Sequence, residues 1–196
     1  MFTPHGLAVD YLGGYIWTSD FVVPASVLKP SPFGSLGGDT VRLWDVETRT
    51  ILNAVEIPNG GGIQDVKIIP GNPDFAAVAT AVALGQIWII YPKRVDPATG
   101  KPGVAELLFD LGPEARETTA IFSALTNDGK YMYVTYTTGN HVAALDISDL
   151  NNIKRLDDPN EAQPITGPHS TVVFDLTDPA NPKYDSQADR NAPSGI

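Results

Sequence analysis

The 196-residue sequence contains no cysteine. This absence excludes disulfide bonds, thiolate metal sites and a cysteine nucleophile on this chain. Histidine is also scarce, with three residues in the whole chain. A metal site built on this sequence would therefore have few imidazole ligands available to it.

Basic residues are few. The chain has 13 Lys and Arg against 23 Asp and Glu, which gives a net charge of −10. Because nucleic acid and anionic membranes would be approached against like charge, we expect neither as a partner. No run of 18 apolar residues is present, and Met1 is not followed by a cationic and then an apolar leader segment. We therefore expect a cytoplasmic protein that does not span a membrane.

Long amphipathic helices are missing as well. No stretch combines an apolar period of 3.6 residues with capping residues, whereas 18 glycines and 17 prolines indicate frequent turns. Hydrophobic residues make up 42% of the chain and charged residues 18%, which is enough apolar material for a packed core. The sequence predicts an all-β fold.

Four short apolar-polar alternating segments recur as a unit along the chain. Turns rich in Gly, Asn and Asp join the segments, as in antiparallel hairpins. The first strands of successive units start about 58 and 56 residues apart, at Gly6, Gln64 and Ala120. Such a period predicts propeller blades, here 6–57, 63–111 and 120–156. A β-sandwich is the competing all-β fold, but its strands would not restart the same four-element order.

The third strands of the units are the most similar to one another. They read "TVRLWDVETRTI", "HVAALDISDLNNI" and "TVVFDLTDPANP". Asp45, Asp146 and Asp175 occupy one position at the strand end, where an Asp side chain accepts hydrogen bonds from the backbone of a following turn. The three tryptophans fall in strands of apolar alternation and are expected in the core. They are Trp17, Trp44 and Trp88.

A fourth unit, 165–184, is incomplete. Gly167-Pro168-His169 repeats the pattern of Pro4-His5-Gly6, but a third strand follows almost at once, without the intervening hairpin. The polar tail 185–196 is expected to be disordered. Propellers close with four to eight blades, so 1–184 predicts a partial propeller. Either further blades belong at its ends, or its open edges associate with another copy, or it forms an open wedge.

The chain resembles the selenium-binding protein family, whose members include methanethiol oxidases. The resemblance covers about four fifths of the chain, in collinear order. It is carried by "WTSDFVVPASVL" from Trp17, "DTVRLWDVETRTIL" from Asp39, "IQDVKIIPGNPDFAAVATAV" from Ile63 and "ALTNDGKYMYVTY…HVAALDISDL" from Ala124. Members of the family are more than twice as long, so this chain looks like an internal segment of such a propeller.

The resemblance implies oxidation of a small thiol such as methanethiol, supported by a histidine-bound copper ion. The selenium-reactive cysteine of the family has no counterpart here, so that function is not transferred. The fourth unit also departs from the family pattern, in which a complete hairpin follows the Gly-Pro-His-like start.

Two histidines precede first strands and would face the same central channel. His5 and His169 hold these positions, and Asp65, on the first strand of the second blade, is the nearest carboxylate. Imidazoles with a carboxylate suit copper or zinc, and the metal ligands predicted are therefore His5, His169 and Asp65. The alternative is that both histidines are ordinary loop residues. His141 opens a third strand, away from the channel, and is expected to be such a residue.

Two function classes remain open at this stage. One is an oxidoreductase of the methanethiol oxidase type with a metal in the channel. The other is a non-enzymatic propeller segment that binds a protein or a small ligand, or a truncated product without independent activity.

Overall fold

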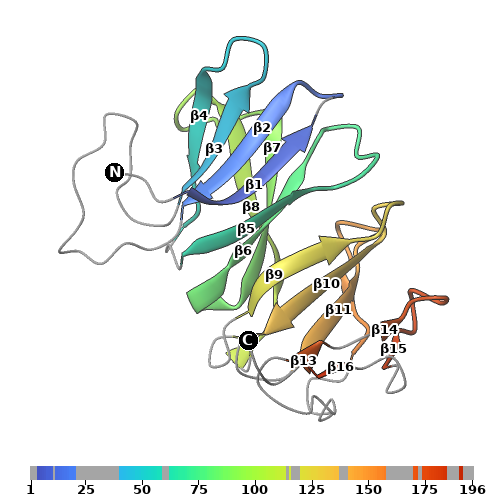
Figure 1. Ribbon diagram of the computed structural model, residues 1–196. Coiled ribbons are helices and arrows are strands. Elements are labelled where there is room, and N and C mark those ends of the chain that lie inside the picture. The colour runs from blue at the N-terminus through green and yellow to red at the C-terminus, as the bar shows by residue number, and fades with distance from the viewer. Residues whose placement is uncertain are drawn as a thin grey trace.

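The computed structural model describes most of the chain (Figure 1). Its described residues are 4–10, 12–20, 40–58, 62–113, 115, 120–136, 141–157, 170–171, 174–184 and 190–191. The predicted loop 24–38 and almost all of the tail 185–196 lie outside them.

Three four-stranded antiparallel sheets follow one another along the chain, and each has its strands in sequence order. We call them blades 1, 2 and 3. Blade 1 comprises β1 (Pro4–Asp10), β2 (Tyr15–Asp20), β3 (Thr40–Asp45) and β4 (Ile51–Glu56). Blade 2 comprises β5 (Ile63–Ile68), β6 (Ala77–Ala81), β7 (Gln86–Val95) and β8 (Pro102–Asp110), with the single-turn 3-10 helix η2 (Val82–Leu84) between β6 and β7. Blade 3 comprises β9 (Ala120–Leu125), β10 (Tyr131–Tyr136), β11 (Val142–Asp146) and β12 (Lys154–Arg155).

The fold is therefore all-β, a partial propeller of three four-stranded blades, as predicted. Figure 1 shows the blades fanned from blue through green to orange, with β1, β5 and β9 beside one another. After blade 3 come β13 (Ser170–Thr171), β14 (Phe174–Asp175), β15 (Lys183–Tyr184) and β16 (Arg190–Asn191). They pair as β13 with β16 and β14 with β15, in two separate two-stranded sheets, and β16 lies in the tail after the fourth unit.

Two apolar cores lie between the blades, one on each face of blade 2. Ala77 and Ala79 of β6 pack in the core shared with blade 1, whereas Val78 packs in the core shared with blade 3. Successive side chains of a strand point to opposite faces. Because both faces of blade 2 are covered, every residue of β6 is buried, and its sequence is continuously apolar apart from Thr80.

The tryptophans divide according to this alternation. Trp17 is fully buried between blades 1 and 2, and Trp88 is buried in the same core, as predicted. The prediction is wrong for Trp44, which is only half-buried. Its neighbour Leu43 points toward blade 2, so Trp44 points to the opposite face, where its indole N–H donates to Thr18 Oγ1 at 3.0 Å.

The aspartates at the ends of the third strands organise the following turns, as predicted. Oδ1 of Asp45 accepts the backbone N–H and the hydroxyl of Thr48 at 2.6 and 2.7 Å. Asp146 makes the same pair of bonds with Ser148, and Asp175 makes it with Thr177. These hydrogen bonds lower the pKa of all three carboxyls. The repeated aspartate is therefore explained by turn formation.

The part of the chain that the structure describes contains no helix long and apolar enough to cross a membrane.

Candidate functional site

The inner strands of the three blades lie next to one another, β1 beside β5 and β5 beside β9. His5 lies in β1, Asp65 in β5 and Ser123 in β9. At Gly6 the backbone of β1 approaches β5 so closely that a Cβ atom would lie 3.0 Å from both Gln64 O and Val66 N. Glycine is required for this approach, and the approach places the backbone of His5 next to the strand that bears Asp65.

Gly6 also links the first two strands of blade 1, β1 and β2. Its N–H donates to the buried Ser19 hydroxyl at 2.9 Å, where the register of the β1–β2 pair shifts between Pro4 and Leu7. The sequence signal for this arrangement is the glycine that directly follows Pro4-His5.

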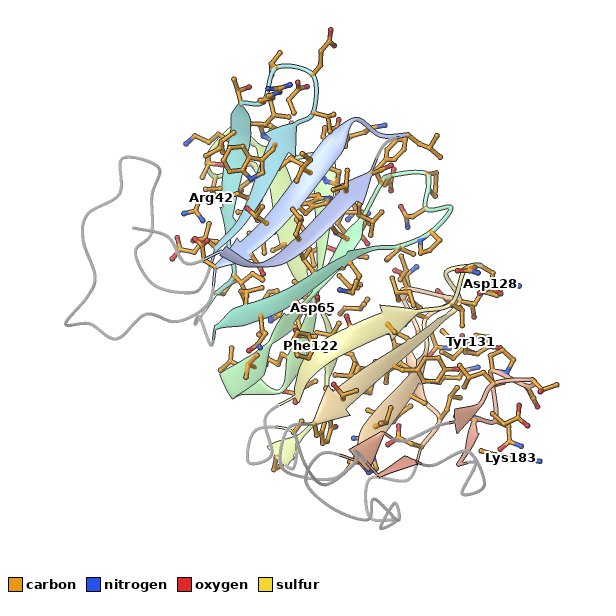
Figure 2. The ribbon with its side chains drawn as sticks, in the orientation of Figure 1. Arg42, Asp65, Phe122, Asp128, Tyr131 and Lys183 are labelled. Carbon is orange, nitrogen blue, oxygen red and sulfur yellow. The ribbon has the colours of Figure 1, made fainter. Side chains whose placement is uncertain are left out.

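Asp65 is buried, with 3% of its surface exposed, and it connects blade 2 to blade 3. Its Oδ2 accepts hydrogen bonds from the Ser123 backbone N–H at 2.8 Å and from the Ser123 hydroxyl at 2.9 Å. Its Oδ1 accepts a bond from Lys67 Nζ at 2.6 Å. Both carboxylate oxygens are therefore engaged, one of them by a cation. Figure 2 labels Asp65 on β5. Sequence analysis placed Asp65 on the inner strand but did not identify these partners.

The side chains of the other two predicted ligands lie outside the described residues. The backbone of His5 lies in β1, but its side chain is outside the described residues, as is the whole of His169. Among the described residues, no three His, Cys, Asp or Glu side chains gather as a metal site requires. The described residues thus do not fit a copper ion by themselves, and the ligand set of His5, His169 and Asp65 stays a prediction.

A polar cluster in blade 3 was not predicted. His141 is 3% exposed and its Nε2 lies 2.7 Å from Asp157 Oδ2. The same carboxylate oxygen accepts bonds from Arg155 Nε and Nη2 at 3.0 and 2.8 Å, and Oδ1 accepts the Ala144 N–H at 2.7 Å. The ring of Tyr136 lies 5.3 Å from the imidazole. His141 is therefore a buried, paired residue, and the expectation of an ordinary loop histidine is wrong, because its partner Asp157 lies 16 positions away in the sequence.

This cluster fastens the edge of blade 3 to its surroundings. Burial raises the pKa of the Asp157 carboxyl, but the hydrogen bonds from His141, Arg155 and Ala144 outweigh it and leave that pKa at about 2. Arg155 Nη1 also donates to the carbonyl of Leu111, in the segment after β8, at 3.0 Å. The short strand β12 is thereby tied both to β11 and to the end of blade 2.

Blade 1 contains a buried ion pair near the start of β1. Arg42 Nη1 donates to Asp20 Oδ2, and both residues are at most 5% exposed. Burial lowers the pKa of the Arg42 guanidinium. Asp20 is the ladder partner of Pro4, so this pair lies at the same end of blade 1 as the His5 backbone.

The fold is that of a partial β-propeller whose blade order follows the chain. No protein-family model matches the sequence, and no curated protein matches it. Solved structures are similar at the level of the fold. A hypothetical selenium-binding protein from Sulfolobus tokodaii is similar with a TM-score of 0.60 and 14% identity, over 78% of this chain and 37% of that one.

Two structures with other activities are similar to a comparable degree. The periplasmic gluconolactonase of Pseudomonas aeruginosa has a TM-score of 0.53 and 16% identity, over 80% of this chain and 40% of that one. Virginiamycin B lyase of Staphylococcus aureus has a TM-score of 0.51 and 16% identity, with 82% and 43% covered. The chain spans less than half the length of these structures. The resemblance to selenium-binding proteins is thus supported at the level of the fold.

Proposed function

We propose that the chain is part of a selenium-binding-type propeller that oxidises a small thiol such as methanethiol. The four stretches of sequence resemblance and the fold-level similarity to the Sulfolobus protein support this proposal. The observation that carries it is the close approach of β1 to β5 at Gly6, because it puts the histidine position of one inner strand beside the carboxylate strand of the next.

The proposal divides the predicted site residues by role. His5 and His169 are the proposed metal ligands, and copper is the proposed metal, because imidazole is a common copper ligand. Asp65 is proposed to hold β9 against β5, since its oxygens already accept bonds from Ser123 and Lys67. In that role it would set the spacing of the inner strands around the channel.

A copper titration of the full chain tests this assignment. We expect Cu(II) to bind at one site, His5→Ala and His169→Ala each to weaken binding by at least about tenfold, and Leu12→Ala to leave it unchanged. Leu12 is a suitable control because it follows β1 in the same hairpin and is almost fully exposed. His141→Ala would be a poor control, because His141 is buried against Asp157.

Activity is measured as the disappearance of methanethiol under air. The copper-loaded chain should exceed the rate of an equal concentration of free Cu(II), and His5→Ala should abolish the excess. Copper binding that is unaffected by either histidine substitution would contradict the ligand assignment. If copper binding depends on His5 but the copper-loaded chain shows no excess rate, thiol oxidation is contradicted and the ligand assignment still holds.

A non-enzymatic role is the second candidate. It is favoured by the complete engagement of the Asp65 carboxylate and by the lack of a three-donor group among the described residues. If no stoichiometric Cu(II) binding is found, this binding-segment function is the one that remains.

A further inference from the structure

Lys67 is the only lysine or arginine in the inner strands β1, β5 and β9. It follows Asp65 by two residues on β5, so both side chains project from the same face of that strand. Lys67 is paired with Val78, which packs in the core between blades 2 and 3. The Lys67 side chain therefore lies on the side of β5 that faces blade 3, where Asp65 meets Ser123.

Asp65 fixes the position of the lysine ammonium group. Lys67 Nζ donates to Asp65 Oδ1 at 2.6 Å, and the lysine side chain is 39% exposed whereas that of the aspartate is 4% exposed. An ammonium group has three donors, and the bond to Asp65 uses one of them. Because the carboxylate is the more buried partner, a small molecule that approaches from solvent meets the ammonium group first.

The ammonium group lies at the same level of β5 as the proposed copper ligand. Gly6, the neighbour of His5, approaches β5 at Gln64 and Val66, which are the residues on either side of Asp65. The Lys67 ammonium group is bound to Asp65 itself. The backbone of His5 thus accompanies β5 on the blade 1 side and the ammonium group lies on the blade 3 side. A ligand at the inner edge of β5 would lie between them.

We propose that Lys67 binds the substrate as a thiolate, with its ammonium group as the counter-ion of the sulfur. The inference rests on the proposed thiol oxidation, and it names the charge state in which the substrate is bound. The thiolate is the form of a thiol that binds metals. The S–H proton passes to solvent as the thiolate binds, so binding requires no further reactant. In a chain with a net charge of −10, a thiolate needs such a local positive charge.

Titration of the copper-free chain with isotopically labelled methanethiol, followed by carbon NMR, measures binding without turnover. The shift of the methyl signal reports whether the sulfur is protonated. The wild-type chain should bind the thiolate, and the bound thiol should lose its proton at a lower pH than free methanethiol, because a neighbouring ammonium group favours the thiolate. Lys67→Met should weaken thiolate binding at least about tenfold, which is about one unit in the apparent pKa of the bound thiol.

Two further variants separate the charge of Lys67 from its packing. Lys67→Arg keeps a positive charge beside Asp65, and it should therefore keep thiolate binding. Lys130→Met is the matched control, because Lys130 also forms an ion pair with an aspartate, Asp128, but lies in the turn between β9 and β10 with its side chain 59% exposed. It should bind the thiolate as wild type does. Thermal melting checks that all three variants fold.

The copper-loaded chain tests the same residue during turnover. The pH profile of methanethiol oxidation should move to higher pH in Lys67→Met and stay in place in Lys67→Arg, which a merely structural ion pair would not cause.

Three results overturn the inference. The first is a wild-type chain that binds no thiolate, and the second is a Lys67→Met chain that binds it as wild type does. The third is loss of thiolate binding in both Lys67→Met and Lys67→Arg, which would assign the effect to packing and not to charge. Thiolate binding that depends on the charge of Lys67, in a chain whose copper-loaded form shows no excess rate, supports the inference and contradicts the proposed oxidation.

Discussion

The substitution Asp157→Asn is expected to destabilise the protein in a way that depends on pH. It keeps the shape of the side chain but removes the negative charge that faces Arg155 and His141. The Asp157 side chain is 8% exposed, so solvent screens this charge little. A pKa lowered from 3.8 to about 2 corresponds to about 2 kcal/mol of folding free energy at neutral pH.

The sign of the pH dependence follows from the lowered pKa. Because the folded protein binds the Asp157 proton more weakly than the unfolded chain does, this stabilisation is complete above about pH 4 and is lost as pH falls toward 2. Asparagine does not titrate. The difference in stability between wild type and Asp157→Asn should thus be largest at pH 7 and should shrink below pH 4, whereas contributions of the other carboxyls cancel in the difference.

Urea unfolding monitored by tryptophan fluorescence measures this difference at pH 7 and at a series of lower pH values. Asp128→Asn serves as the control, because Asp128 is an exposed turn carboxyl whose pKa is lowered by the Thr126 hydroxyl and the Lys130 backbone. Asp128→Asn should lower the free energy of unfolding by less than Asp157→Asn does. A loss at Asp157 below about 0.5 kcal/mol at pH 7, which is ordinary for a surface substitution, would refute a stabilising role of the Asp157 carboxylate in blade 3. A loss of unfolding free energy that is the same at pH 7 and near pH 2 would show that the contribution of Asp157 is not ionic.

Two further substitutions test the contacts between inner strands. Ser123→Ala removes the hydroxyl donor to Asp65 but keeps the backbone donor, so a loss of about 1 kcal/mol is expected in urea unfolding; no loss would mean that the Asp65 contact does not hold the blades. Gly6→Ala would place a Cβ atom 2.6 Å from Ser19 Oγ and 3.0 Å from the β5 backbone, so a loss of about 1–3 kcal/mol is expected. An unchanged melting temperature in Gly6→Ala would argue against the close approach of β1 and β5.

Local patterns predicted the strands well, because hairpins are encoded by neighbouring residues. Alternation marks each strand, and Asp45, Asp146 and Asp175 mark the turns that follow the third strands. The weak last strand expected at 153–156 is present as Lys154–Arg155. The failure at Trp44 has a simple cause. Alternation reveals that a residue shares a face with its second neighbours, but it does not reveal which face is covered.

The candidate site was predicted only in part, because its contacts join distant residues. Asp65 and Ser123 are 58 positions apart, and no local pattern connects them. His141 directly precedes β11, and Asp157 follows β12, 16 positions later in the sequence. The residues next to the histidine therefore give no sign that it is buried. By contrast, Gly6 could be singled out from the sequence, since a glycine after Pro4-His5 at a strand start indicates a close backbone approach.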